Sequence, residues 1–115
     1  MNMKSRVICL SVLILLGFPL SALADELSYK ITIKDHKFSP EVLRVPAKTK
    51  VEILVENLDP AAEEFESYDL RREKVVSAQG KIVMFVGPLK PGVYKYFGDF
   101  HPQTAQGQIV AEEQN

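Results

Sequence analysis

Residues 51–57 read Val-Glu-Ile-Leu-Val-Glu-Asn, a stretch in which apolar and polar side chains alternate. Successive side chains of a β-strand point to opposite faces, so Val51, Ile53 and Val55 are expected on a buried face and the two glutamates in solvent. Residues 27–33, Leu-Ser-Tyr-Lys-Ile-Thr-Ile, alternate in the same way. Both stretches therefore predict half-buried strands of a sheet that is covered on one face.

Beyond these two stretches, the chain from residue 25 onward consists of short strand-like runs between turn residues, and no long run has helical spacing. Prolines at both ends of residues 38–46 favour an edge strand, where a missing amide hydrogen does not interrupt a ladder. The predicted fold is all-β, a single Greek-key β-sandwich of about seven strands. Further strands are expected near residues 65–70, 74–76, 82–86, 93–97 and 107–111.

The first 24 residues have the features of a signal peptide. Lys4 and Arg6 precede the apolar run 7–16, and Ala22 and Ala24 are small residues at the two positions that a signal peptidase recognises. The apolar run is short for a membrane span, so a retained anchor is only the alternative interpretation. We therefore predict cleavage after Ala24, export, and a single domain over residues 25–115.

Charge and cysteine content exclude several functions for that domain. Without the leader it keeps 12 of the 14 basic residues and all 15 acidic residues, a net charge of about −3 with histidine neutral. A nucleic acid is therefore not an expected partner. The single cysteine, Cys9, lies in the predicted leader. Residues 25–115 therefore contain no thiol for a disulfide, a thiolate metal site or a cysteine nucleophile.

An ordered set of motifs resembles bacterial cupredoxins and covers nearly the whole predicted domain. This resemblance implies a sandwich of cupredoxin type, in which metal is bound at one end by loops between strands. The motifs are residues 35–40 (Asp-His-Lys-Phe-Ser-Pro), 43–47 (Leu-Arg-Val-Pro-Ala), 51–59, 89–102 and 107–110.

The resemblance also implies that the usual copper ligands are incomplete. Copper-carrying cupredoxins take a cysteine, a histidine and usually a methionine from the last loop, and a second histidine from an earlier loop. A blue copper site needs the copper–thiolate bond, so the resemblance excludes blue-copper electron transfer for this chain. In the comparison Gly98 stands at the cysteine position, His101 matches the loop histidine, Thr104 or Ala105 replaces methionine, and Glu63 or Glu64 stands near the upstream histidine.

Four phrases resemble a narrower group, the small periplasmic cupredoxin-like proteins associated with bacterial Ftr-type iron permeases. This resemblance implies a periplasmic location and two partners, an inner-membrane iron permease and a periplasmic iron-binding protein. It also implies a role in handling or oxidising iron before import. The phrases are residues 63–67, 72–75, 87–92 and 99–107.

Five residues are candidate metal ligands. His101 lies in a turn between predicted strands, where packing gives no reason for a histidine, so we predict a ligand rather than a solvated or capping residue. Glu64 and Glu66 share one face of an extended segment, which the resemblance places beside the His101 loop; the alternative is a solvated face. Asp99 is a fourth ligand or the acceptor that fixes the His101 tautomer. His36 is the last candidate, with a surface histidine as the alternative.

Imidazole and carboxylate donors suit iron, manganese or copper(II) better than copper(I), so an iron or copper ion is expected. Together with the resemblance, this predicts a periplasmic metal-binding component of a ferrous-iron uptake system that binds iron and helps to oxidise it for a permease. Two alternatives stay open: a metal-free interaction module that docks on a membrane transporter, and a Cu(II)-binding copper-homeostasis protein. The sequence does not decide whether the chain is an enzyme.

Overall fold

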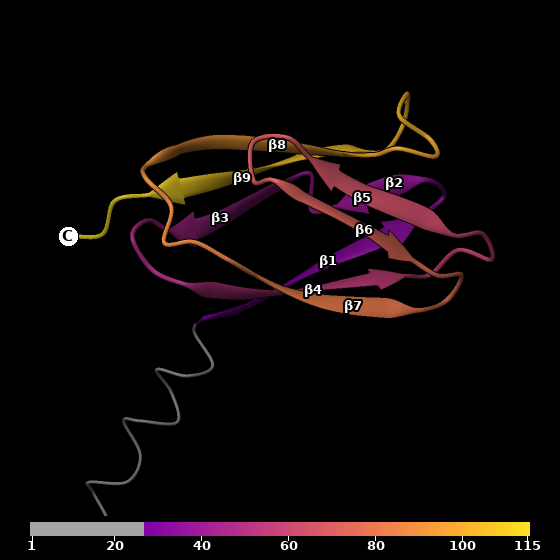
Figure 1. The fold of residues 1–115 in the computed structure, drawn as a ribbon, viewed down its shortest axis with the longest axis horizontal. Helices are drawn as coiled ribbons and strands as arrows, with labels where there is room; N and C mark the ends of the chain where they lie inside the picture. Colours follow the sequence, from indigo (N-terminus) through magenta and orange to yellow (C-terminus); the bar gives the residue numbers. More distant parts are fainter. Residues whose placement is uncertain (1–26) are drawn as a thin grey trace, which may run out of the picture.

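The computed structural model describes residues 27–115, and the predicted signal peptide, residues 1–24, lies outside this range. In the described range nine strands form two sheets that lie face to face as two layers (Figure 1). No helix between residues 27 and 115 is long and apolar enough to cross a membrane. The prediction of an all-β sandwich is therefore confirmed.

The first sheet has four strands in the order β2-β1-β4-β7. Its centre is a parallel pair, in which Ile31 lies opposite Val55, and the other two pairings are antiparallel. The strands are β1 (Ser28–Lys34), β2 (Lys37–Ser39), β4 (Val51–Asn57) and β7 (Lys81–Val86).

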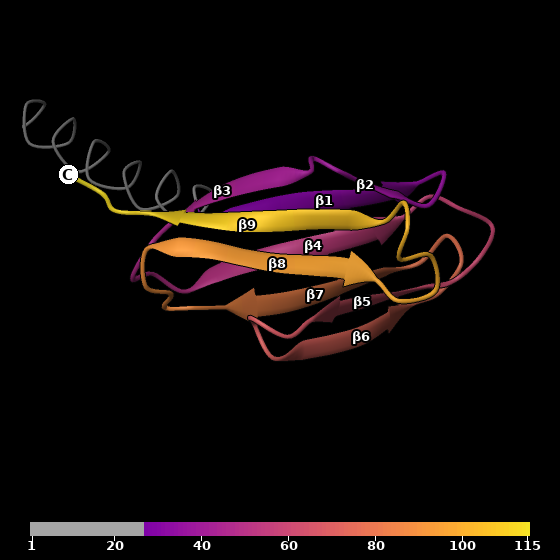
Figure 2. The same ribbon diagram turned by 90° about the horizontal axis from the view of Figure 1, so that it is seen from above.

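The second sheet has five strands in the order β3-β9-β8-β5-β6, and Figure 2 shows β9 and β8 side by side in front of the first sheet. The pair β3–β9 is parallel, and β9–β8, β8–β5 and β5–β6 are antiparallel. The strands are β3 (Val42–Pro46), β5 (Glu63–Ser67), β6 (Arg72–Val76), β8 (Gly92–Gly98) and β9 (Gln106–Glu112).

The core lies between the two sheets and follows the alternation seen in the sequence. Val51, Ile53 and Val55 of β4 are completely or almost completely buried, as predicted, and they pack in one cluster with Ile31 of β1 and Ile109 of β9. Burial of these apolar side chains supplies the main favourable free energy of folding, since no disulfide is available to residues 27–115.

The single strand expected over residues 38–46 is instead two short strands in different sheets. β2 ends at Ser39 and β3 begins at Val42, and the chain crosses from one layer to the other through Pro40 and Glu41. Both pieces are edge strands of their sheets, so the predicted edge position is confirmed. This division raises the number of strands above the expected seven.

Three connections meet at one end of the sandwich. They are the β1–β2 turn at residues 35–36, the β4–β5 loop at 58–62 and the β8–β9 loop at 99–105. In Figure 1 they lie at the right-hand end, away from the C-terminus. Backbone hydrogen bonds hold this end together, from Leu58 N to Ile33 O (2.8 Å) and from Asp99 N to Glu64 O (2.9 Å).

Candidate metal centre

His36, Glu63 and His101 come from three separate parts of the chain and meet at this end of the sandwich. His36 lies in the β1–β2 turn, Glu63 is the first residue of β5, and His101 lies in the β8–β9 loop. Each offers one nitrogen or oxygen atom, and these three atoms lie within 4.8 Å of one another. Imidazole and carboxylate donors that converge in this way can hold a transition-metal ion.

Glu63 is the buried member of this group. It lies on the inward face of β5 and is only 1% exposed. Its Oε1 accepts hydrogen bonds from the backbone amides of Glu64 (3.0 Å) and Phe100 (2.8 Å). Its Oε2 lies 2.7 Å from Nδ1 of His101. Three donors thus compensate for the removal of this carboxylate from water.

Gly98 provides the space for this carboxylate. A Cβ atom at position 98 would lie 2.6 Å from Cδ of Glu63 and 2.7 Å from Cβ of Ala105, which is closer than packed carbon atoms come. Gly98 is itself buried and lies opposite Phe65 in the β5–β8 pairing. The Glu63 carboxylate therefore fills the volume that a side chain at position 98 would need.

His101 is held in a tight loop and is oriented by Glu63. Its backbone amide donates to Gly98 O (3.1 Å), and its carbonyl accepts from the amide of Ala105 (2.9 Å). Because a carboxylate can only accept, the 2.7 Å contact with Glu63 places a proton on Nδ1 of His101 and makes Nε2 the nitrogen available to a metal. Metal-binding histidines are commonly oriented by such a carboxylate.

The rings of His36 and His101 are stacked, with centroids 3.6 Å apart and planes inclined by 16°. The lone pair of an imidazole nitrogen lies in the plane of its ring. An ion in the plane of one ring is therefore out of the plane of the other. A single ion can engage both histidines only after one ring turns out of the stack.

Three aromatic residues pack against one another in the core. Phe65 and Tyr96 stack at 4.8 Å, and Phe38 meets Tyr96 edge-on at 5.0 Å. The hydroxyl of Tyr96 is buried, has no hydrogen-bond partner among the described residues, and burial raises its pKa above the ordinary value.

Glu64, Glu66 and Asp99 form a second group, on the opposite face of β5, and their carboxylate oxygens also lie within 4.8 Å of one another. Glu66 pairs directly with Glu73 of β6. Loss of contact with water raises the pKa of both Glu64 and Glu66, and the charges of Glu73 and Asp99 raise it further. This group therefore consists of carboxylates of like charge, and none of the three is buried.

The structure divides the five predicted ligands between the two groups. His36 and His101 lie together, as expected for candidate ligands, whereas Glu64, Glu66 and Asp99 lie in the other group. The segment of Glu64 and Glu66 does lie beside the His101 loop, since the amide of Asp99 donates to Glu64 O at 2.9 Å, but the alternation of β5 places both carboxylates with Asp99 and not with the imidazole of His101. Whether any of the five binds a metal stays a prediction.

One of the two roles predicted for Asp99, that of acceptor for the His101 ring, belongs to Glu63 instead. The sequence indicated Glu63 only as one possible match to an upstream histidine. Its position on the same face of β5 as Phe65 was the signal that it points inward. Asp59, 6% exposed, was missed altogether. Its Oδ2 lies 3.6 Å from Nδ1 of His36.

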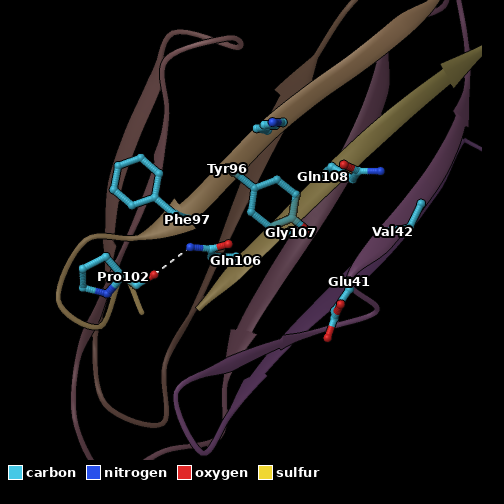
Figure 3. Close-up of a pocket in the computed structure, with 9 residues that line it drawn as sticks. Glu41, Val42, Tyr96, Phe97, Pro102, Gln106, Gly107 and Gln108 are labelled. Carbon is cyan, nitrogen blue, oxygen red and sulfur yellow. Dashed lines mark hydrogen bonds between the residues drawn. The ribbon is translucent and has the colours of Figure 1, made fainter. Parts of the chain in front are cut away.

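A pocket of about 540 Å³ lies beside this end of the molecule, between the start of β3 and the β8–β9 pair. Figure 3 shows it bordered by Glu41, Phe97 and Pro102, with Gln106 donating to Pro102 O at 3.0 Å. Its lining contains no histidine and neither carboxylate group described above. The candidate metal ligands therefore lie outside this pocket.

Comparisons with known proteins agree with this architecture. The family model described as "Cupredoxin-like domain" matches residues 7–111. A Rickettsia prowazekii (strain Madrid E) protein, "Uncharacterized protein RP394", is 52% identical over 87 residues, which are 76% of this chain and 70% of that protein.

Solved structures with a similar fold include three proteins of low sequence identity. Amicyanin of Paracoccus versutus has a TM-score of 0.60 at 14% identity and matches 74% of this chain and 81% of its own. The metal-binding domain of the Cu(I)-exporting P-type ATPase CopA of Streptococcus pneumoniae D39 has a TM-score of 0.66 at 12% identity, over 75% and 85%. A purple cupredoxin of Nitrosopumilus maritimus has a TM-score of 0.55 at 19% identity, over 73% and 99%. These likenesses confirm the predicted type of sandwich.

Proposed function

This chain belongs to the family of cupredoxin-like domains, and on that premise we propose that it binds a transition-metal ion through His36 and His101. The observation that carries the proposal is the 2.7 Å contact between Glu63 and His101, with the ring of His36 stacked on that of His101. Two imidazoles and a buried carboxylate from three separate parts of the chain meet where packing alone would not require them.

The donor atoms fit a hard or borderline ion. The group contains nitrogen and oxygen donors and no sulfur, which favours Fe(II), Fe(III) or Cu(II) over Cu(I). Nε2 of His101 is the principal ligand atom, because Nδ1 is held by Glu63. Glu63 orients this ring and supplies negative charge beside the ion. When bound, iron or copper would supply one-electron redox chemistry.

The biological role that we propose is that of a periplasmic component of a ferrous-iron uptake system. Support comes from the phrases that resemble the cupredoxin-like proteins associated with iron permeases, among them residues 99–107, the segment that contains His101. In this proposal the chain receives iron from a periplasmic iron-binding protein and presents it to an inner-membrane permease. Iron is then the cargo, and Cu(II) is the alternative ion.

Titration of the purified chain with Fe(II) under anaerobic conditions, and separately with Cu(II), tests the binding proposal. We expect one ion per chain, and replacement of the principal ligand in His101→Ala should weaken binding by at least about 100-fold, since a removed ligand costs more than a removed supporting residue. Glu66→Gln is the matched control and should bind as the parent does. Equal affinity of His101→Ala and the parent would refute the proposal.

The uptake role needs a test in cells. Cells that lack this chain should take up radioactive Fe(II) more slowly than the parent strain, and the wild-type gene should restore the rate. His101→Ala should fail to restore it, although the protein is present at the same level. Full restoration by His101→Ala would instead favour the metal-free interaction module.

A further inference from the structure

The backbone at His36 adopts a conformation that is unfavourable for its side chain. Asp35 and His36 have φ angles of 53° and 59° and form a two-residue turn between Lys34 and Lys37, which pair across the β1–β2 hairpin. Turns of this kind favour glycine, most of all at the second position, because both residues need positive φ. A histidine there costs free energy, so another part of the structure has to stabilise the turn.

Asp59 provides that stabilisation. Its Oδ1 accepts a hydrogen bond from the amide of Asp35 (2.7 Å), and its Oδ2 accepts one from the amide of His36 (3.0 Å). Burial alone would raise the pKa of Asp59, but the two amide hydrogen bonds and the nearby histidines outweigh it and lower the pKa. One buried carboxylate therefore caps both amides of the turn.

Asn57 in turn holds Asp59 in place. Asn57 is completely buried, and its Oδ1 accepts a hydrogen bond from the amide of Asp59 (3.0 Å). Its Nδ2 reaches the carbonyl oxygens of Ala61 (2.9 Å) and Val76 (3.2 Å). Asp59 thus rests on a side chain that ties the end of β4 to the β4–β5 loop and to β6.

Glu63 and Asp59 contact the two imidazole rings at different distances. Glu63 makes a direct 2.7 Å contact with the ring of His101, whereas the distance from Asp59 Oδ2 to Nδ1 of His36 is 3.6 Å, too long for a hydrogen bond. The ring of His101 is therefore held by a hydrogen bond, whereas the ring of His36 has only its stack on His101 and the longer contact with Asp59. Since one ring must leave the stack before one ion can engage both, His36 is the ring that is able to turn.

We infer that Asp59 is the positioning residue for His36: it anchors the turn at residues 35–36, keeps His36 beside His101, and leaves the His36 ring free to turn toward an ion. The metal-binding part of this inference rests on the proposed function. The positioning part rests on the hydrogen bonds of Asp59 and is independent of any ion.

NMR of the metal-free chain tests the positioning directly. Stacked imidazoles shift each other's ring protons, so His36→Ala should change the ring-proton shifts of His101, and Asp59→Ala should produce most of the same change. Asp69→Ala is the matched control, because Asp69 also caps a backbone amide, that of Lys95 at 2.8 Å, but does so at another place. It should leave the His101 shifts unchanged.

Parent-like His101 shifts in folded Asp59→Ala would overturn the inference. Should that variant fail to fold, Asp59→Asn gives the answer, since an amide retains one acceptor oxygen for two backbone donors. Asp59→Asn is expected to lose part of the stacking shift. Full retention of the shift in Asp59→Asn would overturn the inference in the same way.

Titration with Zn(II), a diamagnetic probe, tests the consequence for binding. Asp59→Ala should weaken Zn(II) binding roughly 10- to 100-fold, as removal of a supporting residue does at metal sites. In a His36→Ala background the same substitution should have no further effect, because Asp59 acts through His36. An undiminished effect there would contradict the inference. Absence of Zn(II), Fe(II) and Cu(II) binding by the parent would refute only the proposed function, and the NMR measurement would still decide the role of Asp59.

Discussion

The two faces of β5 carry acidic side chains in opposite circumstances. On the inner face, Glu63 is buried and accepts hydrogen bonds from two amides and an imidazole. On the outer face, Glu64 and Glu66 are partly exposed and face the acidic residues Asp99 and Glu73. One strand therefore presents a compensated carboxylate on one side and repelling carboxylates on the other.

This difference shows that the hydrogen-bond donors around an acidic residue, and not the number of acidic residues nearby, determine whether its carboxylate is held in one orientation. A carboxylate surrounded by donors is held in one orientation and can orient a histidine. Carboxylates that face one another share protons and repel, which is common on protein surfaces without any bound ion. The inner group is therefore the candidate metal centre.

The largest effect is expected from Glu63→Ala. Removal of this carboxylate leaves the amide of Phe100 and the ring of His101 without their buried acceptor, which should lower the free energy of unfolding by about 3 kcal/mol or more. Urea unfolding followed by circular dichroism measures this loss. Glu66→Ala on the outer face should cost far less, and equal losses in the two variants would contradict the contrast between the faces.

A smaller loss is expected from Gly98→Ala, because its methyl group would collide with Glu63 and Ala105. Overpacking of this kind typically costs about 1–3 kcal/mol of unfolding free energy. The same substitution should cost less in a Glu63→Ala background, since the carboxylate that it meets is gone. Strictly additive losses of unfolding free energy in the double variant would show that the cost of Gly98→Ala does not come from contact with Glu63.

His36→Gly should stabilise the fold by about 1 kcal/mol, because glycine adopts the positive φ of the turn without strain. The same variant should bind metal more weakly, since the imidazole is lost. Thermal unfolding and Cu(II) titration measure the two effects. A decrease in the unfolding midpoint would mean that the stack on His101 contributes more than the strain of the turn costs.

The smallest effects concern the outer face and depend on pH. The folded-state pKa of Glu66 is raised, so its charged form destabilises the fold above that pKa, and this penalty disappears below the ordinary value of 4.5. Glu66→Gln should therefore raise the unfolding midpoint at pH 7 and leave it unchanged near pH 3.

Glu56→Gln is the opposite control. The hydrogen bond and charge of Lys30 (2.9 Å) lower the pKa of Glu56, so Glu56 contributes stability above pH 4.5 that is lost as the pH falls through the lowered value. Its replacement should lower the midpoint at pH 7. Shifts of the same sign in the two variants would contradict the assigned electrostatics.

The sequence predicted the sandwich because alternation in stretches such as 51–57 sets which side chains are buried, and the structure has the same alternation. The break at Pro40 escaped prediction, since nothing local shows that the chain changes sheets there. The inward face of β5 was identifiable from Phe65, but a buried glutamate is unusual and two of its three donors, Phe100 and His101, lie far along the chain.

The pairing of His36 with Asp59 was even less accessible from the sequence. These residues are 23 positions apart, and their contact depends on a turn with positive φ that local residue preferences do not favour. Asp99 illustrates the reverse error. It lies in the same loop as His101, two residues away in sequence, yet its carboxylate lies with Glu64 and Glu66.

The central claim is that the metal binds at His36, Glu63 and His101, and not at Glu64, Glu66 and Asp99. Electron paramagnetic resonance of the chain with one equivalent of Cu(II) tests it most directly, because nitrogen ligands split the copper signal and oxygen ligands do not. We predict nitrogen splitting in the parent and in the Glu64→Gln/Glu66→Gln variant, and its loss in His36→Ala/His101→Ala. A signal without nitrogen splitting that disappears in Glu64→Gln/Glu66→Gln would contradict the claim.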